Sequence, residues 1–137
     1  MAANRLSIDL NRSQITLVQG NIFRLNERPT LAQHLQDCDL ILCTGLFDYL
    51  PHASAVAMLS EFWSSLAPVG QAFVFNFAPH NPTRAYMEWI GNWYLRYRSQ
   101  QELAAVAAGT GISRDFWALN AEPLGIDFYV TLSKPGS

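Results

Sequence analysis

The stretch DLILCTGLFDYL, residues 39–50, most constrains what this chain can fold into. It holds a short apolar run, residues 40–43, which an acidic residue precedes and a Thr-Gly pair ends. An apolar run of this length with such boundaries is typical of a strand buried on both faces, and such strands belong to parallel sheets. Parallel sheets place their ligand sites just beyond the carboxyl ends of their strands. We therefore expect the chemistry of this protein in residues 44–49.

Length and composition predict one domain over residues 1–137. A chain of 137 residues can bury a core, and its content of 50% apolar and 15% charged residues excludes a disordered chain. The net charge is −2 and the basic residues are scattered, which argues against nucleic acid as a partner. No apolar run approaches the roughly 20 residues of a membrane span, and the N-terminus has no apolar signal core. We expect no membrane association and a cytoplasmic location.

Periodicity and turn residues predict the elements in order. A strand over 15–18 ends at Gly20-Asn21, and residues 1–14 form either a helix end followed by a loop or a first strand paired with it. A short helix at 30–36, the strand at 40–43, a helix at 53–67 and a strand at 72–77 follow. An aromatic helix at 83–95 begins at Asn81-Pro82, and the next helix begins at the capping box Ser99…Glu102. Strands at 114–120 and 126–132 close the chain as an antiparallel hairpin. This alternation predicts an α/β sheet, mostly parallel, with helices on both faces.

The two cysteines flank the predicted strand at 40–43. At about 3.3 Å per residue, Cys38 and Cys43 lie roughly 16 Å apart, which is too far for a disulfide within the chain. We expect plain buried thiols and no metal site.

Several segments resemble the class I S-adenosylmethionine-dependent methyltransferases. DLILCTGLFDYL is similar to the family's fourth strand and following loop, SSLAPVGQAFVFNF to its turn into the fifth strand, and QITLVQGNIFRL to its third strand and adenine loop. The segment NFAPHNPTRAYMEWIGNWYLRYRS looks like one branch, which includes bacterial methyltransferases linked to methyl esters of 3-hydroxy fatty acids. The closing helix and hairpin also resemble the family. The resemblance runs from about Ile15 to Lys134 and implies a truncated Rossmann-like methyltransferase sheet.

This resemblance implies two groups of site residues. The cofactor S-adenosylmethionine would contact the adenine loop and the loop after the fourth strand, namely Gly20, Asn21, Ile22, Thr44, Gly45 and Leu46. The substrate would contact residues beyond the fourth and fifth strands and on the aromatic helix, namely Asp48, Tyr49, Asn76, His80, Tyr86, Trp89 and Trp93. His80 is a candidate general base because an imidazole titrates near neutrality. The residues do not otherwise identify a catalytic group.

Each of these residues also has a purely structural interpretation. Gly20-Asn21 and Gly45 suit turns in any protein, Asp48 suits a helix start, and His80 suits a surface. The aromatic residues Tyr86, Trp89, Trp93 and Tyr97 form one helical stripe, for which core packing is the usual role. The alternatives for the stripe are an apolar wall for a fatty or aromatic substrate and an oligomer contact. For Arg84, Arg96 and Arg98 we expect surface ion pairs rather than a carboxylate site.

The sequence departs from this family where the cofactor is held. It contains no E/D-x-G-x-G-x-G turn, whose backbone supplies much of the hold on the cofactor, so S-adenosylmethionine binding is doubtful. The strand at 40–43 is then left with a free apolar edge, which either the strand at 15–18 or a second copy of the chain would cover. We expect a homodimer through this edge or through the aromatic helix. The expected function is a methyltransferase-like domain that is not competent alone; the alternative is a binding or oligomerisation module without cofactor.

Overall fold

A computed structural model describes residues 15–21 and 33–136 of the chain. The chain divides into two compact units, Met1–His34 and Leu35–Ser137. All helices and strands named below belong to the second unit. Predictions for residues 1–14 and 22–32, including the cofactor contact of Ile22, concern residues outside the described part of the chain.

The described part of the first unit corrects one prediction. Residues 15–21 form neither helix nor strand, and Leu17 and Val18 are 74% and 44% exposed. The predicted strand at 15–18 is therefore wrong, and so is its pairing with the strand at 40–43. A β-branched run favours extended backbone, but it becomes a strand only where another strand accepts its hydrogen bonds. In the short helix expected at 30–36, Gln33 is helical and a turn follows it.

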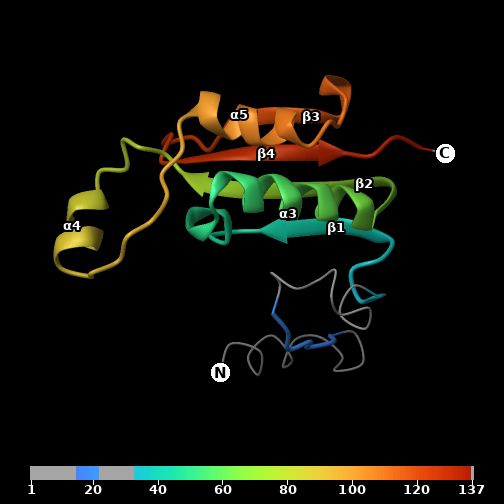
Figure 1. Cartoon of the computed structure of the whole chain (residues 1–137), viewed down its shortest axis with the longest axis horizontal. Helices are drawn as coiled ribbons and strands as arrows, with labels where there is room; N and C mark the ends of the chain where they lie inside the picture. Colours follow the sequence, from blue (N-terminus) through green and yellow to red (C-terminus); the bar gives the residue numbers. More distant parts are fainter. Residues whose placement is uncertain (1–14, 22–32, 137) are drawn as a thin grey trace. The chain divides into compact units, whose positions relative to one another are not determined.

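Four strands form one sheet in the order β1-β2-β4-β3 (Figure 1). The strands are β1 (Cys38–Cys43), β2 (Leu66–Phe77), β3 (Trp117–Ala121) and β4 (Asp127–Ser133). The first pair is parallel, with Ile41 opposite Ala72, whereas β4 runs antiparallel to both β2 and β3. Three strands thus share one direction and β4 opposes them. This confirms the mostly parallel sheet with an antiparallel hairpin at its C-terminal end.

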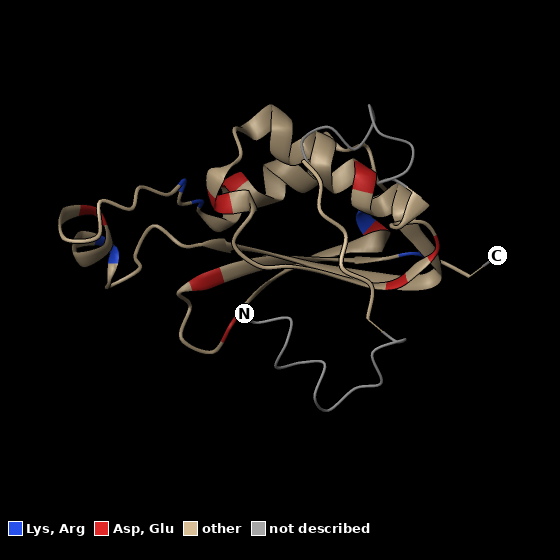
Figure 2. Cartoon of the chain, turned by 90° about the horizontal axis from the view of Figure 1, so that it is seen from below, with Lys and Arg blue, Asp and Glu red and all other residues tan. Residues whose placement is uncertain are grey.

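Two helices pack together on one face of this sheet. They are α3 (His52–Ser65) and α5 (Gln100–Gly109), which contact each other and the strands (Figure 2). Short 3-10 turns, η3 (Phe47–Tyr49) and η4 (Arg114–Phe116), lie between elements. The core is formed where the helices meet the sheet, by residues such as Phe47, Leu59, Phe62, Val74, Leu103, Val106, Val130 and Leu132. Helices were expected on both faces, but among the described residues the two helices that cover the sheet lie on this one face.

The strand β1 differs from its prediction in burial. Ile41 and Cys43 face the helices and are buried, but Leu40 and Leu42 are 55% and 65% exposed. The expectation of burial on both faces is therefore wrong. Its parallel pairing with β2 is confirmed. The apolar run was sufficient to identify a strand. Whether its second face is buried depends on other segments of the chain that pack against it, and the sequence of the strand alone does not specify these.

The aromatic helix is also shorter than predicted. The helix α4 spans Arg84–Trp89, and Asn92, with φ 47°, ends any continuation. Tyr86, Trp89 and Trp93 are 69%, 86% and 47% exposed, so the prediction that this stripe packs in the core is wrong. In Figure 1, α4 lies beyond the end of β2, away from the sheet. By contrast, the Ser99…Glu102 capping box is present as predicted.

Within residues 33–136, no helix combines the length and apolar character that crossing a bilayer requires.

Candidate functional site

The exit from β1 is an open turn built on Gly45. This glycine has φ +90°, a backbone conformation that side chains disfavour, and a Cβ added to it would meet no atom within 4 Å. The turn continues into η3, where the Tyr49 amide donates to the Leu46 carbonyl at 3.1 Å. Thr44 is exposed, and Gly45 and Leu46 are half-buried, at the carboxyl end of β1, where a parallel sheet places its ligands.

Asp48 and Asn76 meet at the adjacent ends of β1 and β2. Asp48 is 2% exposed, and its Oδ1 accepts from Asn76 Nδ2 and from the Phe77 amide, both at 2.8 Å. Asn76 is fully buried, and its Nδ2 also donates to the Arg96 carbonyl at 2.9 Å. The structure thus brings together two residues that the sequence placed in the same site. Their hydrogen bonds give them a structural role, and substrate contact by either stays a prediction.

Arg98 completes this buried network. Its guanidinium donates to the Phe47 carbonyl at 2.7 Å, to the Leu50 carbonyl at 2.5 Å and to Asn76 Oδ1. Arg98 is only 6% exposed, so the expectation of a surface ion pair is wrong for this residue. One side chain therefore ties both sides of η3 to the end of β2. We call Asp48, Asn76 and Arg98 the polar network.

Burial governs the ionisation of the polar network. Desolvation raises the pKa of Asp48 to about 6, although the hydrogen bond from the Phe77 amide and the nearby Arg98 charge act against the rise. Desolvation likewise lowers the pKa of Arg98, and the Asp48 charge acts in the opposite direction. The pKa of this carboxyl group is thus raised toward neutrality inside a site that fixes the loop after β1.

A second contact joins this loop to the segment after α4. Trp93 Nε1 donates to the Tyr49 hydroxyl at 2.6 Å, which brings two predicted substrate residues together. Both side chains are about half exposed. Tyr86 and Trp89, on α4 itself, are exposed to a greater degree. The structure therefore gathers aromatic side chains beside η3 and leaves those of α4 open to solvent.

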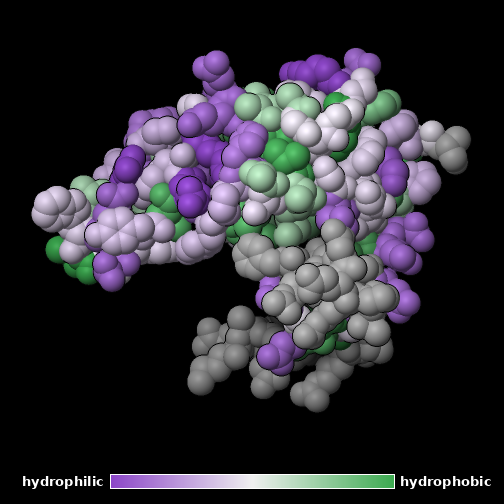
Figure 3. Space-filling view, viewed as in Figure 1, coloured by the Kyte–Doolittle hydropathy of each residue, from purple (hydrophilic) through white to green (hydrophobic). Residues whose placement is uncertain are grey.

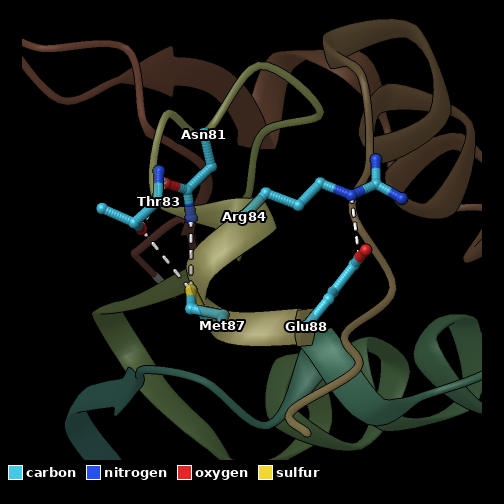
Figure 4. Close-up of polar contacts among 5 residues, drawn as sticks. All are labelled: Asn81, Thr83, Arg84, Met87 and Glu88. Atoms are coloured by element: carbon cyan, nitrogen blue, oxygen red, sulfur yellow. Dashed lines mark hydrogen bonds and ion pairs between the residues drawn. The ribbon is translucent and has the colours of Figure 1, made fainter. Parts of the chain in front are cut away.

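The start of α4 is held by Asn81, as Figure 4 shows. Asn81 Oδ1 accepts from the Thr83 amide at 3.0 Å and from the Thr83 hydroxyl at 2.7 Å. The helix itself begins at Arg84, slightly later than predicted. Arg84 forms the expected surface ion pair, with 2.8 Å between its Nε and Glu88 Oε1, and its guanidinium lies 4.4 Å from the centre of the Tyr97 ring.

The remaining predicted residues lie outside the polar network. His80 is exposed, and its ring centre lies 5.8 Å from that of Phe128. Gly20 and Asn21 are exposed residues of the first unit, so their part in an adenine loop stays a prediction. Both cysteines are free, and burial raises the pKa of the Cys43 thiol to about 11. In residues 15–21 and 33–136, no His, Cys, Asp and Glu side chains cluster as a metal site would need.

Comparisons with solved structures identify the architecture. A possible exported protein from Bordetella parapertussis matches with a TM-score of 0.72 at 18% identity, over 98% of this chain and 49% of its own. An O-methyltransferase family protein from Burkholderia thailandensis matches with a TM-score of 0.67 at 12% identity, over 99% of this chain and 41% of its own. The chain has a methyltransferase-like fold.

A third structure adds a bound ligand to the comparison. Magnesium protoporphyrin IX methyltransferase from Synechocystis, solved with bound SAH, matches with a TM-score of 0.61 at 14% identity, over 97% of this chain and 57% of its own. The chain thus spans about half the length of the structures it matches. No family model matches the sequence, and no curated protein is significantly similar to it.

Proposed function

We propose that this chain contributes one half of an S-adenosylmethionine-dependent methyltransferase site and is not a competent enzyme alone. The observation that supports the proposal is the open Gly45 turn at the carboxyl end of β1, within a methyltransferase-like fold. The missing Gly-rich turn supports the second part, because the 137 residues contain no segment of that pattern. The cytoplasmic location expected from the sequence, and the bacterial origin implied by the resemblance, also stay predictions.

The residues of the turn after β1 would contact one side of the cofactor. Thr44, Gly45 and Leu46 would hold it, since the space where a side chain of Gly45 would lie is open. By resemblance, Gly20, Asn21 and Ile22 would contact the adenine. When bound, S-adenosylmethionine supplies an electrophilic methyl group. The polar network would act through position, because it fixes the loop that carries Tyr49.

The aromatic residues suggest an apolar methyl acceptor. Tyr49 and Trp93 are joined by a hydrogen bond and are half exposed, and Tyr86 and Trp89 offer further apolar surface. Flat aromatic surfaces bind fatty or aromatic groups through burial of apolar area. His80 is the candidate base that would take the proton of an acceptor hydroxyl.

Calorimetric titration with S-adenosylmethionine and S-adenosylhomocysteine tests this proposal. We expect no binding heat from this chain at millimolar ligand. The Synechocystis methyltransferase, whose structure holds SAH, is the positive control. Micromolar binding by this chain would contradict the claim that it is not competent alone. In that case Thr44→Arg, which places a long side chain at the open turn, should abolish the heat, and Ala108→Arg at an exposed position of α5 should not.

A second candidate function is a binding module that needs no cofactor. The observation in its favour is the exposure of Trp89, at 86%, in a segment that the sequence suggested would be buried. Figure 3 shows hydrophobic atoms at the outer tip of this segment. Retention of an apolar or aromatic ligand by the wild-type chain without S-adenosylmethionine, lost in Trp89→Ala, would favour this function over the first.

A further inference from the structure

The strand β1 has one edge that no described strand covers. In the order β1-β2-β4-β3 it lies at the end of the sheet and pairs only with β2. Alternate residues of a strand direct their backbone N–H and C=O groups to opposite sides. About half of these groups in β1 therefore point away from β2, as a template for a further strand.

Apart from Asp39 and an irregularity in the pairing between Cys38 and Leu40, this edge carries none of the features that keep sheet edges apart. Within Cys38–Cys43 there is no proline, lysine or arginine, and the only charge is that of Asp39 near the start. Leu40 and Leu42, more than half exposed, stand on the face opposite the helices. Proteins that leave an edge strand free usually place charges or proline in it. The composition of β1 is therefore typical of a strand that pairs with another strand along each edge.

We propose that the outer edge of β1 binds the same edge of a second copy of this chain. The strand is self-complementary in an antiparallel register with Ile41 opposite its own copy. In that register Leu40 lies opposite Leu42 of the second copy, in two symmetric apolar pairs. Asp39 lies opposite Cys43 of the second copy, so the two carboxylates stand at opposite ends of the pairing. The charge pattern of the strand thus permits self-association.

The same charge pattern selects antiparallel pairing over parallel pairing. A symmetric parallel pair would place Asp39 beside Asp39 of the second copy, and like charges opposite each other are destabilising. Antiparallel pairing joins the two sheets with α3 and α5 on the same side in both copies. Because a six-residue edge buries less than a standard interface, we expect micromolar rather than nanomolar affinity. This inference does not depend on the cofactor proposal, because its test measures assembly and not ligand heat.

Sedimentation equilibrium of the full chain over 1–100 µM (about a hundredfold range) tests the proposal. We expect a reversible dimer in the wild type and a monomer in Leu40→Lys/Leu42→Lys, which places ammonium groups opposite each other in both leucine pairs. The matched control is Ile90→Lys/Leu124→Lys, which makes the same charge change at residues that are 72% and 78% exposed. The control should remain dimeric, and circular dichroism should show that both variants fold.

Two results would overturn the proposal: a monomeric wild type across this range, or a dimer that survives Leu40→Lys/Leu42→Lys. Disulfide trapping tests the register separately. In a Cys38→Ser/Cys43→Ala background, Leu40→Cys and Leu42→Cys chains should cross-link when mixed, since opposed Cα atoms lie within disulfide reach. Each variant alone should cross-link much less. Equal cross-linking of one variant alone would show that the register is wrong.

Discussion

Arg98 shows how one buried side chain can hold a functional loop. Its guanidinium donates to the carbonyls of Phe47 and Leu50 and to Asn76 Oδ1. Arg98→Met keeps much of the apolar volume but removes these buried hydrogen bonds, and the Phe47 carbonyl then retains only the bond from the Leu50 amide. We expect the free energy of unfolding to fall by about 3 kcal/mol, measured by urea denaturation.

The matched control for this prediction is Arg96→Met, two positions earlier. The Arg96 side chain is exposed, and it is the backbone of this residue that contacts the network, through its amide to the Asp48 carbonyl and its carbonyl to Asn76. We expect a change within about 0.5 kcal/mol. Equal effects of the two substitutions would mean that the loss of a positive charge, and not the hydrogen bonds of Arg98, destabilises the fold.

Asp48 should make the stability of the protein depend on pH. Its pKa in the fold is raised to about 6 by burial, above that of an exposed carboxyl, so the folded chain binds this proton more tightly than the unfolded chain does. Its contribution is therefore full below about pH 4 and is lost as the pH rises through 6. Relative to Asp48→Asn, the wild type should lose up to about 2 kcal/mol of unfolding free energy between pH 4 and 7.

Urea denaturation of both proteins at several pH values measures this difference. The Asp48→Asn variant is a suitable reference, since an asparagine side chain retains the oxygen that accepts from Asn76 and Phe77 and does not titrate. Glu102 provides a contrast, because hydrogen bonds from the Ser99 amide and hydroxyl lower its pKa and give a slope of opposite sign. A wild-type curve parallel to that of Asp48→Asn would show that Asp48 does not titrate in this window.

The sequence located part of this site and missed its centre. The sequence identifies Asp48 and Asn76 because one follows, and the other ends, two strands that run parallel and whose ends lie side by side. The sequence favours a surface position for Arg98, because arginine is rarely buried and its acceptors, the carbonyls of Phe47 and Leu50, are backbone atoms. Backbone acceptors leave no signature in a sequence, so this network required coordinates.

At the scale of elements, α4 and α5 differ in whether their apolar side chains are buried. Trp89 on α4 is 86% exposed, whereas Leu103 on α5 is 1% exposed. We expect Leu103→Ala to reduce the free energy of unfolding by about 2–5 kcal/mol and Trp89→Ala to change it by less than about 0.5 kcal/mol. Thermal and urea denaturation of the two variants give the comparison. A large loss in Trp89→Ala would mean that α4 is packed in solution.

The elements also show where sequence patterns carry information. The Ser99…Glu102 capping box and the closing hairpin were predicted correctly, because each depends on residues close in sequence. The sequence overestimated the length of α4 because the aromatic spacing continues past Gly91-Asn92. In the structure this pair ends the helix, since Asn92 has a left-handed backbone conformation. The prediction of a strand at 15–18 was wrong because a strand, unlike a capping box, is not determined by nearby residues. A strand depends on a distant partner, and no local pattern specifies one.

At the scale of the whole molecule, the second unit holds the complete described sheet and both helices that cover it. Every described core residue, from Ile41 to Leu132, belongs to Leu35–Ser137. We therefore expect a chain shortened to residues 35–137 to fold alone, with a cooperative urea transition and the far-UV circular dichroism of an α/β domain.

The shortened chain also connects stability with assembly, because it retains the full outer edge of β1 and both exposed leucines. Sedimentation should give a dimer of at least the strength seen for the full chain, since nothing that forms the proposed contact has been removed. The shortened form of Leu40→Lys/Leu42→Lys is the matched control and should be monomeric and folded. If both forms of the shortened chain unfold or aggregate, residues before Leu35 are needed to stabilise the sheet. The second unit would then not be an independently stable domain.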